Sequence, residues 1–456
     1  MTVTTEDFDK SGGPIQVFYT PAGGRRRPTV SRAEGIYIWD TAGKRYLDAS
    51  SGAVVANLGH GNGRVIEEMQ QQAAKVCFVA RAQFENQPNK ELSNLVTSLV
   101  GPGLERAFAV SGGSEATEAA IKLARQYAVT KGETARWKVL CRNPGYHGAS
   151  LGAVSVTGDP ETESMYGPMI RVMPRVPAPF TYRLPDGYDA DSYARHCAQR
   201  LEEVIVEEGP ESVLAFIMEP VGGLATGALV APPHYYTAVR EICDRHGVLL
   251  IYDEVMSGAG RTGTFLAADH WPGARPDLVT LAKGIGAGYT PLGMLLAPAG
   301  MVEAVAQSGG FLHGHTYSAN PLSCAIGVAV VREMLDRELM ANAHAMGNLL
   351  RSKLADIQKG SSILGDIRGI GLLNAIEIVA DRESKAIFDS SVRTIPRILE
   401  LAGARGLLLY ARRTAAGRYG EWLMVTPPLT VTESDIAEIV KLLDETLKAF
   451  ERELGR

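Results

Sequence analysis

Short apolar runs separated by amphipathic stretches make up the middle of the chain. The amphipathic stretches at 193–206 and 234–246 repeat their apolar residues at helical spacing. The runs expected as buried strands are FAV at 108–110, VLC at 139–141, AFIM at 215–218, VLLIY at 248–252 and LVTLA at 278–282. Buried strands that alternate with helices predict an α/β protein with a mostly parallel sheet, and such sheets bind ligands at the carboxyl ends of their strands.

The N-terminal part of the chain has a different pattern. Residues 1–30 are rich in Gly, Pro and Arg, which is typical of an extended arm. The sequence IYIWDTAGKRYLDAS at 36–50 then alternates apolar and polar positions around Thr41-Ala-Gly. This pattern predicts a β-hairpin with those three residues at its turn.

The character of the chain changes again after about Pro321. We expect a long helical stretch from Pro321 through Ala355 and a closing helix near Glu433 to Glu453, which Thr432 begins with a capping box. The apolar stripe of the closing helix is formed by Ile436, Ile439, Leu443 and Leu447. The predicted organisation is an arm and part of a small domain over 1–60, a large domain over 61–320 and a C-terminal small α+β domain over 321–456.

Length, composition and charge exclude several classes of protein. The 456 residues exceed what one hydrophobic core usually serves, and 45% apolar with 21% charged residues excludes a disordered or collagen-like chain. The net charge is −5, from 46 basic and 51 acidic residues without a basic block. We therefore expect neither nucleic acid nor an anionic membrane as the main partner.

The cysteines and the absence of targeting patterns predict a cytoplasmic protein. The N-terminus has early acidic residues and no apolar signal segment, and no run of about 18 apolar residues occurs. The five scattered cysteines include no C-x-x-C pair, so they indicate reduced thiols that pack in the core, and no metal site is expected. They are Cys77, Cys141, Cys197, Cys243 and Cys324.

A glycine-rich turn follows the first expected strand. The sequence SGGSEATEAAIKLAR at 111–125 turns from the strand into a helix, and its small residues let backbone N–H groups approach an anion. A phosphate could bind to the amides of Gly113 and Ser114. The simpler interpretation is an ordinary turn with Ser114 as the helix N-cap. A P-loop is excluded because no Lys-Ser/Thr pair follows the glycines.

Two charged residues end buried strands further along the chain. Asp253 closes VLLIYD, where an unpaired carboxylate would be costly, so it requires a cationic or proton-donating partner. Lys283 closes LVTLAK without charged neighbours, and buried lysines have lowered pKa values and form imines. The G-x-G-x-x-G match at 258–263 is rejected as a dinucleotide site, since Asp253 and Glu254 would repel a pyrophosphate and no long helix follows.

Further strand ends carry groups of the same chemistry. Tyr146 and His147 lie between glycines after the VLC strand, Glu219 follows AFIM, and Thr316 belongs to a hydroxyl-rich GHTYS segment. An imine-forming lysine with a carboxylate for a pyridinium nitrogen is what pyridoxal phosphate (PLP) requires.

The sequence resembles the class III, fold type I PLP-dependent aminotransferases, a group that includes omega-amino acid and amine:pyruvate transaminases. The motifs SGGSEA, GYHG, EPV, DEV-x-x-G-x-G-R-T-G, AKGI and HTYS occur in family order between GKRYLD at 43–48 and TPPL at 426–429. The resemblance implies the type I fold: a large domain with a mostly parallel sheet, and a smaller α+β domain.

The resemblance also implies roles for single residues. Lys283 would form the Schiff base with PLP, and Asp253 would pair with the pyridine nitrogen. Val255 would pack on the ring opposite Tyr146, while Gly113 and Ser114 would bind the phosphate. The remaining cofactor contacts are expected from His147, Glu219 and Thr316. Thr316 would reach the phosphate of the neighbouring subunit, which implies a homodimer, or a dimer of dimers, with shared active sites.

The substrate pocket departs from the family pattern. The arginine that commonly holds the acceptor carboxylate follows a Gly-Leu-Leu stretch, but here Gly406-Leu-Leu-Leu leads to Tyr410 and Ala411 before any arginine. Its place falls to Arg412, with Arg413 and Arg418 as alternatives. Val54, Phe84 and Tyr146 are expected pocket walls. The favoured reaction moves an amino group from an amine or omega-amino acid donor to a 2-oxo acid such as pyruvate, in ping-pong order.

Two other functions use the same fold. An aminomutase, epimerase or decarboxylase would need the same lysine, aspartate and phosphate turn, but it would consume no 2-oxo acid. A non-catalytic PLP-binding regulator would need a DNA-binding segment, and an N-terminal arm of roughly 30 residues is too short for one.

Overall fold

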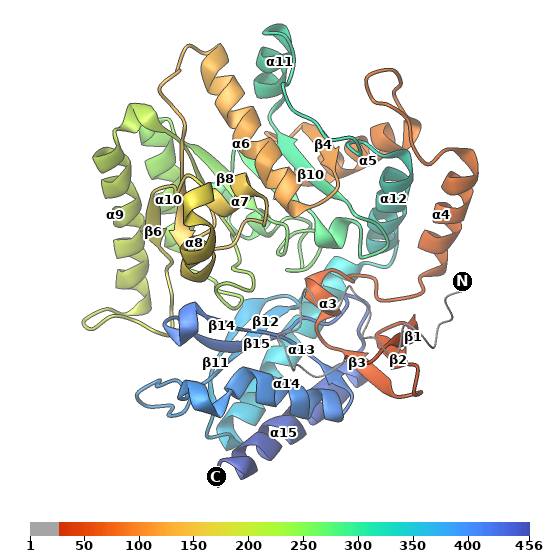
Figure 1. The fold of residues 1–456 in the computed structure, drawn as a ribbon, viewed down its shortest axis with the longest axis vertical. Helices are drawn as coiled ribbons and strands as arrows, with labels where there is room; N and C mark the ends of the chain where they lie inside the picture. Colours follow the sequence, from red (N-terminus) through yellow and green to blue (C-terminus); the bar gives the residue numbers. More distant parts are fainter. Residues whose placement is uncertain (1–26) are drawn as a thin grey trace, which may run out of the picture.

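A seven-stranded sheet forms the centre of the larger half of the molecule in the computed structural model, which describes residues 27–456 (Figure 1). β10 pairs antiparallel with β4 and β9, and the other strand pairs of this sheet are parallel, so the expected mostly parallel sheet is confirmed. The strand order is β4 (Arg106–Val110), β10 (Gly293–Ala297), β9 (Leu278–Leu281), β8 (Leu249–Asp253), β7 (Val213–Met218), β5 (Lys138–Asn143) and β6 (Arg175–Pro177).

Helices cover both faces of this sheet. Buried residues of α6 (Gly113–Thr130) and α11 (Ala299–Gln307) share one hydrophobic cluster with one face. The other face belongs to the main cluster, to which α5 (Gln87–Val100), α9 (Ala190–Glu208) and α10 (Pro233–His246) contribute. Because both faces are covered, β7 is buried at every position, as its continuous apolar sequence predicts.

The smaller half contains an antiparallel sheet with helices on it. The strand order is β11 (Leu364–Ile370), β12 (Leu373–Ile378), β15 (Gly420–Val425) and β14 (Tyr410–Thr414). The helices are α13 (Leu339–Gly360), α14 (Thr394–Ala404) and α15 (Glu433–Glu453). The capping box at Thr432 and the buried apolar stripe of α15 are confirmed.

The N-terminal strands lie beside this smaller half. The hairpin of β2 (Tyr37–Asp40) and β3 (Arg45–Asp48) is confirmed, and β1 (Val30–Glu34) pairs with β2. On its other edge, β3 pairs in parallel with β13 (Leu407–Leu408). This pairing joins the N-terminal hairpin to the C-terminal part of the chain. The extended arm expected over 1–30 falls mainly outside the described residues.

The long helix expected from Pro321 through Ala355 is in fact two helices. α12 (Pro321–Asp336) ends at Arg337, and α13 begins after Glu338, whose φ of 50° is left-handed and interrupts the helical hydrogen bonds. α12 packs on α4 (Gly63–Lys75) and α5, whereas α13 packs on β11 and α15. The domain boundary expected at residue 321 stays a prediction.

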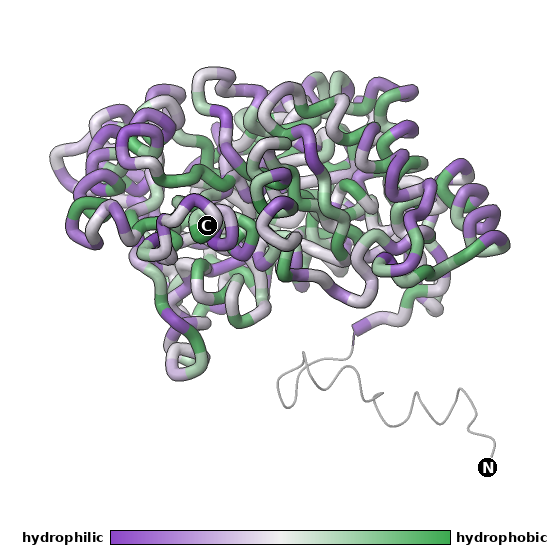
Figure 2. Tube along the Cα trace, turned by 90° about the horizontal axis from the view of Figure 1, so that it is seen from above, coloured by the Kyte–Doolittle hydropathy of each residue, from purple (hydrophilic) through white to green (hydrophobic). Residues whose placement is uncertain are grey.

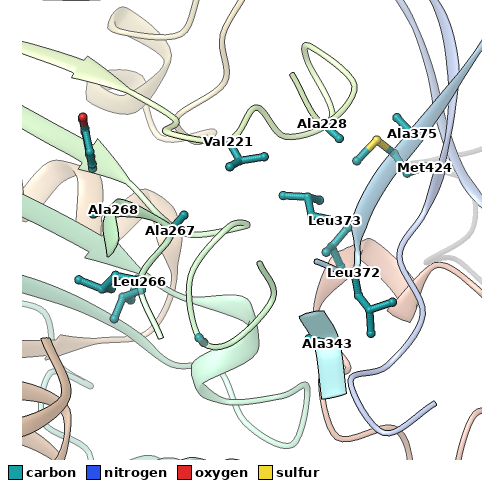
Figure 3. Packing of buried hydrophobic residues seen from close by; sticks show 14 of the residues in the cluster. Val221, Ala228, Leu266, Ala267, Ala268, Ala343, Leu372, Leu373, Ala375 and Met424 are labelled. Atoms are coloured by element: carbon teal, nitrogen blue, oxygen red, sulfur yellow. The ribbon is translucent and has the colours of Figure 1, made fainter. Parts of the chain in front are cut away.

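Hydrophobic packing joins the two halves. Val221 and Ala228, which follow β7, lie in one cluster with Leu373 and Ala375 of β12 and with Met424 of β15 (Figure 3). Hydrophobic and hydrophilic residues alternate along the trace (Figure 2), and no helix within residues 27–456 has the length and apolar character needed to cross a bilayer.

Close packing of α13 predicts the effect of one methyl group. A Cβ on Gly347 would lie 1.9 Å from the Gly371 carbonyl oxygen, so Gly347→Ala should destabilise the protein by roughly 1–3 kcal/mol. Gly403→Ala in α14 is the matched control, because nothing lies within 4 Å and alanine favours a helix by about 1 kcal/mol. Thermal unfolding of both variants tests this, and a neutral Gly347→Ala would contradict the packing.

Candidate active site

A cavity of about 490 Å³ lies where the carboxyl ends of β7, β8 and β9 meet strand β14. This volume is in the range of small-molecule sites, roughly 300–1,000 Å³. Its polar and charged lining residues are Ser111, Ser114, Tyr146, His147, Glu219, Asp253, Lys283, Thr290, Tyr410 and Arg412. The structure thus brings together most of the residues that the sequence singles out.

Asp253 is a buried carboxylate with three hydrogen-bond donors. Its Oδ1 accepts from the Val255 backbone N–H at 3.0 Å and from the Thr280 hydroxyl at 3.3 Å, and its Oδ2 lies 2.7 Å from His147 Nδ1. The proton-donating partner expected for this strand end is therefore His147, with two further donors. Thr280 is the one polar residue of the LVTL strand, a signal that could have identified it.

Lys283 follows β9 with a strained backbone, since its φ of 48° is left-handed. Burial lowers the pKa of Lys283 to about 8, even though the charges of Asp253 and Glu219 act to raise it. Within residues 27–456, no group accepts a hydrogen bond from its amine. The lysine is therefore held near two carboxylates that have other partners, and a large share of it is uncharged at mildly alkaline pH.

The N-terminus of α6 forms the glycine turn. The helix begins at Gly113 with Gly112 as N-cap, so the expectation of Ser114 as N-cap is wrong. Ser114 Oγ instead accepts a hydrogen bond from Ala149 N–H at 2.9 Å. A Cβ on Gly113 would lie 2.9 Å from Val255 Cγ1, so only glycine allows this approach. Because the amides of a first turn have no partner inside the helix, the turn offers donors to an anion.

Tyr146 and Glu219 lie beside this arrangement. Tyr146 is 43% exposed at the cavity, and its backbone N–H donates to Glu219 Oε2 at 3.4 Å. Glu219 Oε1 accepts from Gly223 N–H at 2.8 Å. Burial raises the pKa of Glu219, and this carboxyl is held by two backbone amides rather than by Lys283.

Three expected site residues do not line the cavity of this chain. Val54 is buried, while its neighbours Ala53 and Val55 line the cavity. Phe84 is 62% exposed, and Thr316 is exposed as well. Within one chain, neither Phe84 nor Thr316 contributes to the cavity.

Side chains alternate between the two faces of strand β14, and this alternation distinguishes Arg412 from Arg413. Arg412 lines the cavity together with Tyr410, two residues earlier on the same face. Arg413 points to the other face, where it pairs with the buried Glu421. Arg418 lies outside the strand and contacts the Tyr419 ring. Tyr410 was not expected in the site, although this alternation could have identified it.

The cavity fits PLP. It combines a lysine without a hydrogen-bond partner in the described part of the chain, a buried carboxylate with a free approach from the cavity, and a glycine turn at a helix N-terminus. On a seven-stranded, mostly parallel sheet, this set defines a fold type I PLP-dependent enzyme.

The chain belongs to the class-III aminotransferase family, because the model of that family matches residues 20–447. It is 37% identical to the uncharacterized aminotransferase YodT of Bacillus subtilis over 94% of this chain and 97% of that protein. It is 30% identical to a putrescine–pyruvate aminotransferase of Pseudomonas aeruginosa, over 92% of this chain and 91% of that protein.

Solved structures agree with this assignment. The omega transaminase from Pseudomonas jessenii in complex with PMP superposes with a TM-score of 0.90, at 29% identity, over 100% of this chain and 99% of that one. The predicted class of enzyme and the cofactor are confirmed: the protein is a PLP-dependent aminotransferase of class III.

The lowered pKa of Lys283 predicts a pH-dependent stability. The unfolded lysine keeps its proton to about pH 10.5 and the folded one only to about 8, so the stability of the PLP-free protein should rise with pH between these values. Below pH 8 the charged amine costs roughly 1–3 kcal/mol, which Lys283→Met removes. The variant should therefore unfold at a higher temperature than the natural protein at pH 7. This difference in unfolding temperature should narrow towards pH 10.

The matched control is Lys353→Met, since Lys353 is an exposed residue of α13. The difference in unfolding temperature between Lys353→Met and the natural protein should not change over the same pH range. A Lys283→Met variant that is no more stable at pH 7, or whose difference from the natural protein widens with pH, would contradict the account of this lysine.

Proposed function

We propose that this aminotransferase moves an amino group from an amine or omega-amino acid to a 2-oxo acid such as pyruvate, in ping-pong order. The observation that carries the proposal is that Lys283, Asp253 and Arg412 line one cavity. Two similar proteins named above, a putrescine–pyruvate aminotransferase and an omega transaminase, support this substrate class.

Lys283 is the residue that we assign to the covalent bond with PLP, and Asp253 the residue for its pyridine nitrogen. Gly113 and Ser114 are assigned to the phosphate, and Val255 to one face of the ring. Bound PLP supplies the electron sink that weakens the Cα–H bond of an amine. The close contact of Gly113 with Val255 leaves this part of the cavity no room for a larger side chain.

Lys283 then has a second task as the group that moves a proton. An amine with a pKa of about 8 both accepts and returns a proton near neutral pH, so it is suited to removing the proton from the substrate Cα. Asp253 stays fixed during this transfer, because three donors hold its oxygens. A group of this kind typically contributes ~10²–10⁴ in rate.

A second copy of the chain would complete the site. Large apolar side chains are exposed in two neighbouring segments: Phe78 and Phe84 in one, Leu312 and Tyr317 in the other. The rings of Phe78 and Tyr317 are 5.9 Å apart, so the two segments form one surface. A homodimer that covers this surface would explain the exposure and would bring Thr316 to the partner's phosphate turn.

Arg412 is the proposed partner of the acceptor carboxylate. Its guanidinium lies at the cavity, and a charged hydrogen bond of this kind is worth about 1.5–3 kcal/mol. Arg413 is excluded because it serves the buried Glu421, and Arg418 because it does not line the cavity.

We call this binding of the acceptor carboxylate by Arg412 the clamp. It is tested by following alanine formation from pyruvate with n-butylamine as donor. Arg412→Ala should raise the KM for pyruvate roughly 10- to 100-fold and change the KM for butylamine much less. Arg418→Ala is the control, since Arg418 is an exposed arginine of the same segment. Equal effects of Arg412→Ala on both substrates would remove Arg412 as the clamp, and no alanine from any primary amine would refute the proposed reaction.

A further inference from the structure

An ion pair between the two halves of the molecule stands at the edge of the cavity. Arg412 Nη2 on strand β14 donates to Asp159 Oδ2, which precedes α8 (Pro160–Tyr166) in the larger half. The Asp159 side chain is only 7% exposed and that of Arg412 21%. An arginine that is proposed to bind a substrate carboxylate thus already has a carboxylate partner.

Asp159 is the fixed member of this pair. It is the N-cap of α8, with Oδ1 accepting from Glu161 N–H at 3.2 Å and Oδ2 from the Thr162 hydroxyl at 3.1 Å. A Cβ on the preceding Gly158 would lie 2.1 Å from the Arg142 carbonyl oxygen, so the backbone is tightly packed there. The position of this carboxylate is therefore determined by the larger half alone.

Asp159 is also a permanent anion. Burial acts to raise the pKa of Asp159, but the charge and hydrogen bond of Arg412 outweigh it and hold the pKa below its ordinary value. In the physiological range, Asp159 consequently offers a full negative charge to the guanidinium.

Arg412 is the member that is free to change partners. Among residues 27–456, Asp159 is the only group that accepts a hydrogen bond from it, so most of its five N–H donors remain for another acceptor. Tyr146 and Tyr410 lie beside Arg412 in the cavity lining and carry no charge at neutral pH. In the described part of the chain, Asp159 is the only carboxylate that forms an ion pair with Arg412, so it is the group that neutralises the guanidinium when the substrate has no carboxylate.

We propose that Asp159 is a specificity-determining positioning residue that neutralises Arg412 during the amine half-reaction and competes with the 2-oxo acid for it in the acceptor half-reaction. The inference rests on the proposed role of Arg412. An unpaired guanidinium next to an uncharged amine substituent would be costly, and Asp159 removes that cost. The same pairing weakens the binding of the acceptor, because the substrate carboxylate must displace or share the Asp159 carboxylate.

The test uses the PLP-loaded enzyme and the variant Asp159→Asn, with Asp159→Ser as a second variant because serine retains the N-cap without the charge. The KM for pyruvate should fall about 3- to 10-fold, and the KM for n-butylamine should rise by a similar factor. Glu163→Gln on the same helix α8 is the matched control, since it breaks the ion pair of Glu163 with Arg175 of β6 and should shift neither KM value.

A purely structural role of Asp159 predicts a different result. Damage to α8 would raise both KM values or lower kcat for both half-reactions, and either pattern in both variants would overturn the inference. In an Arg412→Ala background, Asp159→Asn should have no further effect on the ratio of the two KM values. A ratio that still changes would also overturn it.

The experiment separates this inference from the proposed function. If Arg412→Ala leaves the KM for pyruvate unchanged, the clamp itself is wrong. If Arg412→Ala raises that KM but neither Asp159 variant shifts the two KM values in opposite directions, the clamp stands and the role of Asp159 is refuted.

Discussion

The placement of one lysine amine in a poorly solvated cavity is the constraint on which the account of this enzyme depends. An amine beside two carboxylates would normally stay charged, and a charged amine is neither a nucleophile nor a base. Here both carboxylates are engaged elsewhere: Asp253 with His147, Thr280 and a backbone amide, and Glu219 with two backbone amides. Burial therefore decides the protonation of Lys283, and its pKa falls to about 8.

The shape of the cavity depends on contacts between the two halves. Strand β14 supplies Tyr410 and Arg412 to a cavity whose other walls end the parallel strands. The buried guanidinium of Arg261 helps to hold the halves, donating to the Pro427 carbonyl oxygen and, at 2.6 Å, to Asn57 Oδ1 in the N-terminal segment. Both halves of one packed core therefore contribute residues to the cavity.

Much of the fold could be predicted because its strands are buried on both faces and appear as uninterrupted apolar runs. Residues at the ends of such strands meet at one edge of the sheet, which is why Asp253, Lys283 and the glycine turn could be grouped without coordinates. The exact ends of the helices were harder to predict from the sequence. The break at Glu338 and the N-cap at Gly112 depend on packing and on single backbone angles that no apolar pattern encodes.

The substrate side was harder to predict because it is built from segments far apart in the chain. Asp159 and Arg412 are 253 positions apart, and neither stands in a motif that refers to the other. Val54 shows the opposite difficulty, since a shift of one residue decides whether a side chain enters the cavity or the core, as Val55 and Val54 do. Phe84 and Thr316 do not line the cavity of one chain, so their part in the site stays a prediction.

The most direct test of the central claim is to treat the PLP-loaded enzyme with borohydride and to locate the reduced adduct by peptide mass spectrometry. The account predicts one adduct per chain, on the peptide that contains Lys283, and none after Lys283→Met. A chain without an adduct, or one whose adduct lies on another lysine, would contradict it.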